Sequence, residues 1–107
     1  MKKLVFLLLV SELLSAGCAR HYHRIEDGTL EMFLKAKASS VLFASSLDNY
    51  TPVPAARTGR DTWVVSVPAG REFSYFYVID GAVFVPECTY RESDEFGSEN
   101  CIYIPGM

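Results

Sequence analysis

Histidines and carboxylates are the residues of this chain whose types could support catalysis or metal binding. His21 and His23 stand at alternate positions, which would place two imidazoles on one side of an extended segment. No cysteine, aspartate or third histidine stands at a spacing that would complete a metal site, so a solvated linker is the preferred interpretation. No serine or cysteine has a clear histidine base, and the carboxylates lack a second domain that could enclose a glycosidic bond. We therefore predict a protein that is not an enzyme and holds no metal or other cofactor.

Acidic residues near the C-terminus could bind calcium through hard oxygen ligands. They are Glu92, Asp94, Glu95 and Glu99. Their spacing is not that of a calcium loop, so a solvated loop is the preferred interpretation. The formal net charge of the chain is −3, and lysine and arginine do not cluster. This charge pattern argues against nucleic acid as a partner.

Cys18 ends the run Leu-Ser-Ala-Gly-Cys, which follows two lysines and an apolar stretch over residues 4–10. Basic residues, a short apolar core and small residues form a secretory signal, and the cysteine makes it typical of a bacterial lipoprotein signal. The apolar stretch is about half of the ~20 residues that cross a bilayer. We predict a signal peptide over residues 1–17 and a lipid anchor on Cys18. The protein would then lie in the cell envelope, at the outer membrane where the host has one.

Two residues depart from the lipoprotein pattern. Ser15 stands where such signals usually carry leucine, and Glu12 adds a charge near the cleavage region. The alternative is an ordinary secretory signal cut nearby, which would leave Cys18 as a free thiol or within the removed peptide. Both interpretations export the protein.

Cys88 and Cys101 are the other two of the three cysteines. In an exported protein such a pair is expected to form a disulfide, here between a loop and the start of the last strand. The alternative is two buried free thiols.

Apolar runs separated by turn residues predict strands beyond a polar tether over residues 18–28. The runs cover residues 30–35, 41–44, 62–67, 73–79, 82–85 and 101–104. Asp80-Gly81 is typical of a tight hairpin turn, and Trp63 leads an alternating set that should face the core. Past the signal no window keeps a helical period. Six or seven short strands over residues 29–107 predict an all-β, immunoglobulin-like antiparallel β-sandwich.

Three segments in register resemble the early-set glycogen-binding modules, which occur in isoamylases, glycogen-branching enzymes and the β subunit of AMP-activated protein kinase. Gly70-Arg71 with Phe73 to Gly81 resembles the strand and hairpin of these modules. Thr62 to Val65 resembles their first tryptophan-containing strand, and Phe96 to Asn100 resembles the segment that enters their last strand. The resemblance covers roughly Leu30 to Ile104 and implies the same sandwich.

The resemblance also implies a sugar site, in which aromatic rings stack on glucose and polar groups bind its hydroxyls. Tyr50 stands at the place of a tryptophan in the family's turn, and Phe96 at the place of an apolar residue that threads into the glucan spiral. Ser98 and Asn100 match positions that supply hydrogen bonds. The alternative interpretation gives Tyr50 a structural role at the sandwich edge and gives Asn100 a bond to the backbone.

Two sugar-binding positions of the family are changed in this chain. Phe76 replaces the strand lysine of the kinase module, and Val83 replaces the second stacking tryptophan. A fold does not confer an activity, so two functions remain open. The first is a membrane-anchored module that binds α-glucan or another glycan. The second is a protein-interaction module of a cell-envelope assembly, with an exposed aromatic patch of Phe76, Tyr77 or Phe84.

Overall fold

The computed structural model describes residues 20–93 and 97–106. This part of the chain forms β-strands and one short 3-10 helix, η1. In chain order the elements are β1 (Arg20–Glu26), β2 (Thr29–Lys35), β3 (Val41–Ser45), η1 (Ser46–Asp48), β4 (Val53–Pro54), β5 (Ala56–Arg57), β6 (Thr62–Pro68), β7 (Phe73–Ile79), β8 (Ala82–Phe84), β9 (Arg91–Ser93) and β10 (Glu99–Tyr103).

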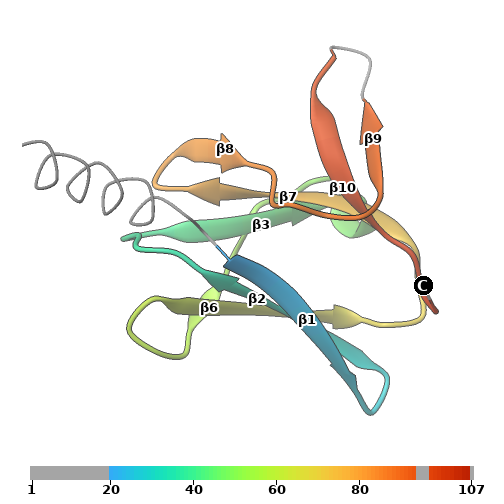
Figure 1. Cartoon of the computed structure of the whole chain (residues 1–107), viewed down its shortest axis with the longest axis horizontal. Helices are drawn as coiled ribbons and strands as arrows, with labels where there is room; N and C mark the ends of the chain where they lie inside the picture. Colours follow the sequence, from blue (N-terminus) through green and yellow to red (C-terminus); the bar gives the residue numbers. More distant parts are fainter. Residues whose placement is uncertain (1–19, 94–96, 107) are drawn as a thin grey trace, which may run out of the picture.

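The strands form two antiparallel sheets that lie one above the other (Figure 1). The four-stranded sheet has the order β1-β2-β6-β5. The six-stranded sheet has the order β4-β3-β7-β10-β9, and β8 also pairs with β7. This arrangement confirms the predicted all-β, immunoglobulin-like sandwich. β9 and β10 project from the six-stranded sheet on the side away from β1 and β2 (Figure 1).

The core lies between the sheets and is built by residues that alternate along the strands. On β2 the inward side chains are Leu30, Met32 and Leu34, each no more than 1% exposed. Trp63 is buried as predicted, and its indole N–H donates to the carbonyl oxygen of Ala36 at 3.2 Å. The six-stranded sheet contributes mainly aromatic rings, which pack edge-on or tilted against one another. These rings are Phe43, Phe73, Tyr75 and Tyr77.

Residues 20–26 form a strand, where the polar composition predicts a tether. The turn after β1 is Asp27-Gly28, with φ of 51° and 76°, the left-handed backbone that a two-residue hairpin requires. β1 pairs with β2 along its whole length, so that His21 and His23 lie opposite the inward residues Leu34 and Met32. The expected tether is therefore wrong for residues 20–28. The sequence is polar because the inner face of this strand carries the imidazoles of His21 and His23 where other strands carry apolar side chains.

The predicted signal peptide and lipidation site, residues 1–17 and Cys18, lie outside the described residues. Within the part of the chain that the structure describes, no helix is long and apolar enough to cross a membrane.

Candidate functional site

Tyr50 is held against β7 by an unusual backbone conformation. After η1, Asn49 and Tyr50 both have left-handed backbones, with φ of 60° and 62°. Asparagine tolerates this region, but for a bulky residue it costs on the order of 1 kcal/mol. The Tyr50 hydroxyl forms a hydrogen bond with the Ser74 hydroxyl, in which either oxygen can donate. The Tyr50 N–H donates to the Ser45 carbonyl oxygen at 2.7 Å. The turn therefore directs the tyrosine ring back onto β7.

The Tyr50 ring lies nearly parallel to the Phe76 ring. The planes differ by 15° and the centroids are 6.0 Å apart. Rings in full face-to-face contact would be closer, so this pair is offset and neither ring covers the whole face of the other. Both side chains are half-buried. We call these two rings the Tyr50–Phe76 platform.

The platform lies on the outer face of the six-stranded sheet. Tyr75 and Tyr77 point into the core, so Phe76 and Ser74 point outward. Ser74 pairs with Ile102 of β10, and directly paired residues share a face. Asn100, two residues from Ile102, is therefore on the same face of the sheet as the platform.

The structure thus brings two of the four predicted sugar-binding residues to one surface. It places Tyr50 and Asn100 on one face of the sheet, and Asn100 is half-buried opposite Glu92. Ser98 is exposed next to the start of β10. Phe96 lies outside the described residues. Sequence reasoning counts Phe76 as the loss of a sugar-binding lysine and as part of an aromatic patch for a protein partner, and it does not pair this ring with Tyr50 in one site. The alternation of β7 already indicates that the ring faces outward next to the predicted site.

An apolar row crosses the same outer face. Register places Val83, Val78, Leu42 and Pro54 side by side on four neighbouring strands. Val83 is 68% exposed. The predicted aromatic patch is corrected here, because Tyr77 is 1% exposed in the core and Phe84 packs against the core cluster. Of the three proposed rings, only Phe76 faces outward.

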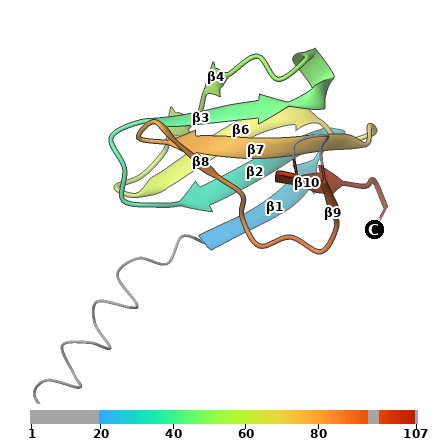
Figure 2. The same ribbon diagram turned by 90° about the horizontal axis from the view of Figure 1, so that it is seen from above.

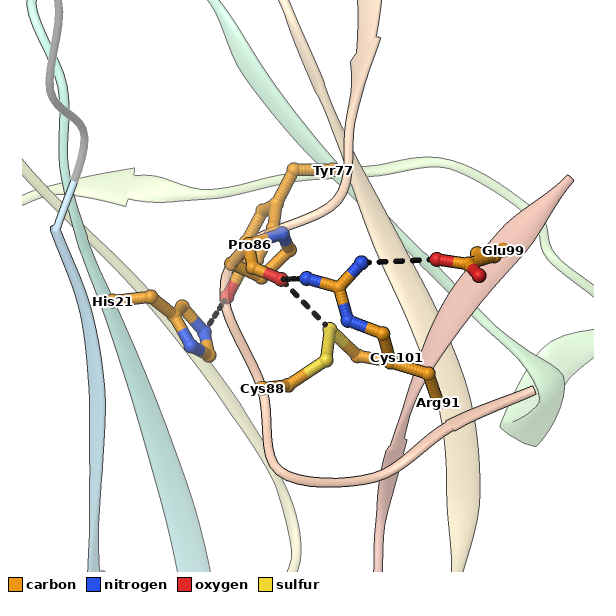
Figure 3. Close-up of a disulfide and its surroundings, with 7 residues drawn as sticks. All are labelled: His21, Tyr77, Pro86, Cys88, Arg91, Glu99 and Cys101. Atoms are coloured by element: carbon orange, nitrogen blue, oxygen red, sulfur yellow. Dashed lines mark hydrogen bonds and ion pairs between the residues drawn. A yellow bond between two sulfur atoms is a disulfide. The ribbon is translucent and has the colours of Figure 1, made fainter.

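A second site candidate is a hollow of about 450 Å³ between β1 and the segment 86–90. Its lining includes His21, His23, Tyr75, Glu87 and Tyr90. Nε2 of His21 and the hydroxyl oxygen of Tyr77 are 2.8 Å apart in a hydrogen bond (Figure 3). Burial, and secondarily the charge of His23, lower the pKa of His21 to about 4. Burial also raises the pKa of Tyr75 to about 12 and that of Tyr77 well above its usual value.

The shifted pKa values keep His21, Tyr75 and Tyr77 neutral at pH 7, and the three rings pack against one another. The expected solvated linker is wrong for His21, which fixes β1 to the opposite sheet. Among the described residues, no group of three or more histidines, cysteines and carboxylates could hold a metal ion.

The far wall of this hollow is fixed by the predicted disulfide. Cys88 and Cys101 are bonded, with Cα atoms 6.0 Å apart. Arg91 donates from Nη2 to the Pro86 carbonyl oxygen at 3.2 Å and from Nη1 to Glu99 at 3.1 Å (Figure 3). The Cys101 sulfur lies 3.3 Å from the same carbonyl, a contact without a hydrogen because the sulfur is in the disulfide.

A polar hollow of about 610 Å³ lies among loops and is lined by Lys37, Arg60, Asp61 and Asp80, with Ala38 and Ser39. The carboxylate of Asp80 accepts the N–H groups of Ser39 and Ser40, each at 2.9 Å. Asp80 also has the left-handed φ of 49° that its turn requires. Its predicted role in the turn is confirmed, and its carboxylate is committed to the backbone.

Comparison with known proteins adds no assignment to this geometry. The sequence matches no protein-family model, and no curated protein matches it. The Tyr50–Phe76 platform is the candidate binding arrangement, because it combines two offset, half-buried rings with a polar side chain, Asn100, on the same face of the sheet.

Proposed function

We propose that this chain is a non-catalytic binding module of the cell envelope, anchored by a lipid on Cys18, which binds a glycan on the outer face of its six-stranded sheet. The observation that carries the proposal is the offset, half-buried Tyr50–Phe76 platform. Sugar rings have apolar faces that pack on aromatic rings, and their hydroxyls need polar partners nearby. Asn100 supplies such a partner on this face, and α-glucan is the first ligand to test.

The strained backbone at Tyr50 supports a role in binding. A left-handed φ of 62° at a tyrosine persists only where its surroundings enforce it, and such residues cluster at ligand sites. The Ser74 hydrogen bond and the contact with Phe76 orient the ring before a ligand arrives. This preorganisation reduces the entropy lost on binding.

A second stacked pair provides a matched control. Tyr22 and Phe33 lie on the outer face of the other sheet, with planes 9° apart and centroids at 5.0 Å. Their rings overlap more closely than those of the platform. The Arg24 guanidinium also lies 5.4 Å from the Phe33 centroid and covers this ring. This pair is therefore a poorer sugar platform, although it has the same composition.

The test is a titration of the full chain with maltoheptaose and β-cyclodextrin by calorimetry. We expect binding that Tyr50→Ala weakens at least about tenfold, ~1.4 kcal/mol. Tyr50→Phe should retain most of the affinity, and Tyr22→Ala should bind as the unmodified chain does. No detectable binding at millimolar sugar would reject α-glucan as the ligand. Equal affinity in Tyr50→Ala would reject the platform as the site.

The anchor is tested separately by metabolic labelling with palmitate. We expect label on the mature protein that is lost in Cys18→Ser. An unlabelled protein in both cases would instead indicate the ordinary secretory signal.

A protein partner on the same face is the second candidate function. The row of Val83, Val78, Leu42 and Pro54 favours it, because Val83 is 68% exposed and has apolar neighbours on adjacent strands. Val83→Lys would then abolish partner binding while leaving any glycan affinity unchanged.

A further inference from the structure

β1 is the one long strand that ends a sheet in the described part of the chain. β4 and β5 end their sheets with two residues each, and β9 ends its sheet with three. β1 has seven residues. Figure 2 shows it as the outermost strand beside β2. A short strand at the edge of a sheet offers few unpaired backbone groups to another strand, whereas a long edge strand offers a full row of them.

The backbone of β2 shows which groups of β1 face this free edge. Ala69 donates its N–H to the Gly28 carbonyl oxygen at 3.0 Å, and Ala36 donates to Asp61 at 2.9 Å. These bonds flank the pairs Thr29–Pro68 and Lys35–Thr62, which are therefore non-hydrogen-bonded pairs between β2 and β6.

It follows that Thr29 and Lys35 direct their own N–H and C=O groups toward β1. Their partners Glu26 and Arg20 direct theirs toward β2, as do Tyr22 and Arg24 by alternation. The N–H and C=O groups of the remaining β1 residues point outward. These residues are His21, His23 and Ile25.

We propose that β1 pairs antiparallel with β1 of a second copy of this chain, in the register that places His23 opposite its own counterpart. In this register His21 of each copy lies opposite Ile25 of the other copy. It is the one antiparallel register that uses all three outward N–H groups and all three outward C=O groups of each copy. The two four-stranded sheets then become one continuous sheet.

The side chains of β1 are complementary to themselves in this register. Arg20 of one copy lies opposite Glu26 of the other, and this ion pair occurs twice. Tyr22 lies opposite Arg24, which already stacks over Phe33 and bonds Glu31 at 3.0 Å. Opposite charges and an aromatic ring beside a guanidinium both stabilise cross-strand pairs.

Exposure and space on β1 agree with a second strand. Tyr22 and Ile25 are 45% and 55% exposed, and both would be covered by the added strand. The hollow of about 450 Å³ lies between β1 and the segment 86–90, so there is room for inward side chains of the second copy. The Tyr50–Phe76 platform is on the other sheet and stays free, so the dimer does not depend on the proposed glycan function.

The test is sedimentation equilibrium of the full chain in detergent, with charge variants that probe the register. Arg20→Glu should raise the dimer dissociation constant about tenfold, because two attractive pairs become repulsive. Arg20→Glu combined with Glu26→Arg should restore it to within about threefold. A chain that stays monomeric at 100 micromolar, roughly a hundred-thousandfold above the dissociation constant of a tight nanomolar dimer, overturns the proposal. A double variant as weak as Arg20→Glu overturns the register.

Proline variants supply an independent test of the edge. His23→Pro removes an outward N–H, which edge strands tolerate, so it should abolish the dimer while the thermal midpoint changes little. Arg24→Pro removes an N–H bonded to β2 and should destabilise the monomer itself. Retention of the dimer in folded His23→Pro, shown by circular dichroism, would contradict pairing through this edge.

Discussion

The two walls of the hollow beside β1 are held in place by different means. β1 is fixed by a regular ladder to β2 and by the bond between His21 and Tyr77. The opposite wall, residues 86–90, belongs to no strand and is fixed by the disulfide and by Arg91. A polar segment can therefore join a sheet without a covalent link when a tight turn aligns it. An irregular segment needs a covalent bond and side-chain donors.

Among the substitutions that test the two walls, removal of the disulfide should lower the free energy of unfolding most. Closing a loop with a sequence separation of 13 stabilises the fold by about 3 kcal/mol in the chain-entropy model. Cys88→Ala should therefore lower the free energy of unfolding by about 3 kcal/mol, as measured by urea denaturation. Reductant should lower the stability of the unmodified chain similarly and leave Cys88→Ala unchanged. A loss below about 1 kcal/mol would show that packing alone holds residues 86–90 in place and that the disulfide is not needed for it.

Acidification should weaken the β1 wall next. The pKa of His21 is about 4 in the folded protein against an ordinary value of 6.5, so the unfolded chain takes up the proton first as pH falls. This contribution to stability is present above pH 6.5 and is lost between 6.5 and about 4. We expect a loss on the order of 2 kcal/mol. This is less than the full difference between the two pKa values would give, because the ring keeps some contact with water.

Denaturation at a series of pH values checks this expectation. His21→Gln should flatten the profile between pH 6.5 and about 4, whereas His23→Gln should keep most of its slope. An unchanged slope in His21→Gln would mean that the imidazole is not buried against Tyr77.

Arg91 should show the smallest effect. Its bond to the Pro86 carbonyl is partly shielded, whereas its ion pair with Glu99 joins side chains that are 39% and 55% exposed. Arg91→Ala should lower the free energy of unfolding by about 1 kcal/mol, whereas Glu99→Gln should change it by less than about 0.5 kcal/mol. Equal losses in the two variants, measured by urea denaturation, would assign the stabilisation to the ion pair and not to the backbone contact.

The two Asp-Gly turns show how much of the fold is readable from the sequence. Asp80-Gly81 is recognisable because apolar runs flank it on both sides. Asp27-Gly28 has the same left-handed backbone, but only the run after it is apolar. β1 escapes prediction because its inner face is formed by histidines on tyrosine rings, and no pattern of apolar residues indicates such contacts. The feature of the sequence that could have indicated this hairpin is the dipeptide Asp27-Gly28 itself, which is typical of a two-residue turn.

The candidate site is less predictable than the core. Leu30, Met32 and Leu34 follow simple alternation, and the pairing of Cys88 with Cys101 is the one expected for two cysteines outside a predicted export signal. Tyr50, by contrast, reaches Phe76 through a strained turn. Asn49 is a residue type that often adopts a left-handed backbone, but nothing in the local sequence indicates that Tyr50 adopts one as well. Long-range register then brings Asn100 to the same face, and register is a property of the whole sheet.

Amide hydrogen exchange along β1, followed by NMR on the full chain, tests most directly whether this strand is part of the sheet with one edge free. At low concentration the N–H groups of Tyr22, Arg24 and Glu26 should be protected, whereas those of His21, His23 and Ile25 should exchange rapidly. Raising the concentration should protect the second set as two copies pair. Exchange of all six at the rate of an unfolded chain would contradict the strand. Alternating protection that never changes with concentration would contradict the pairing.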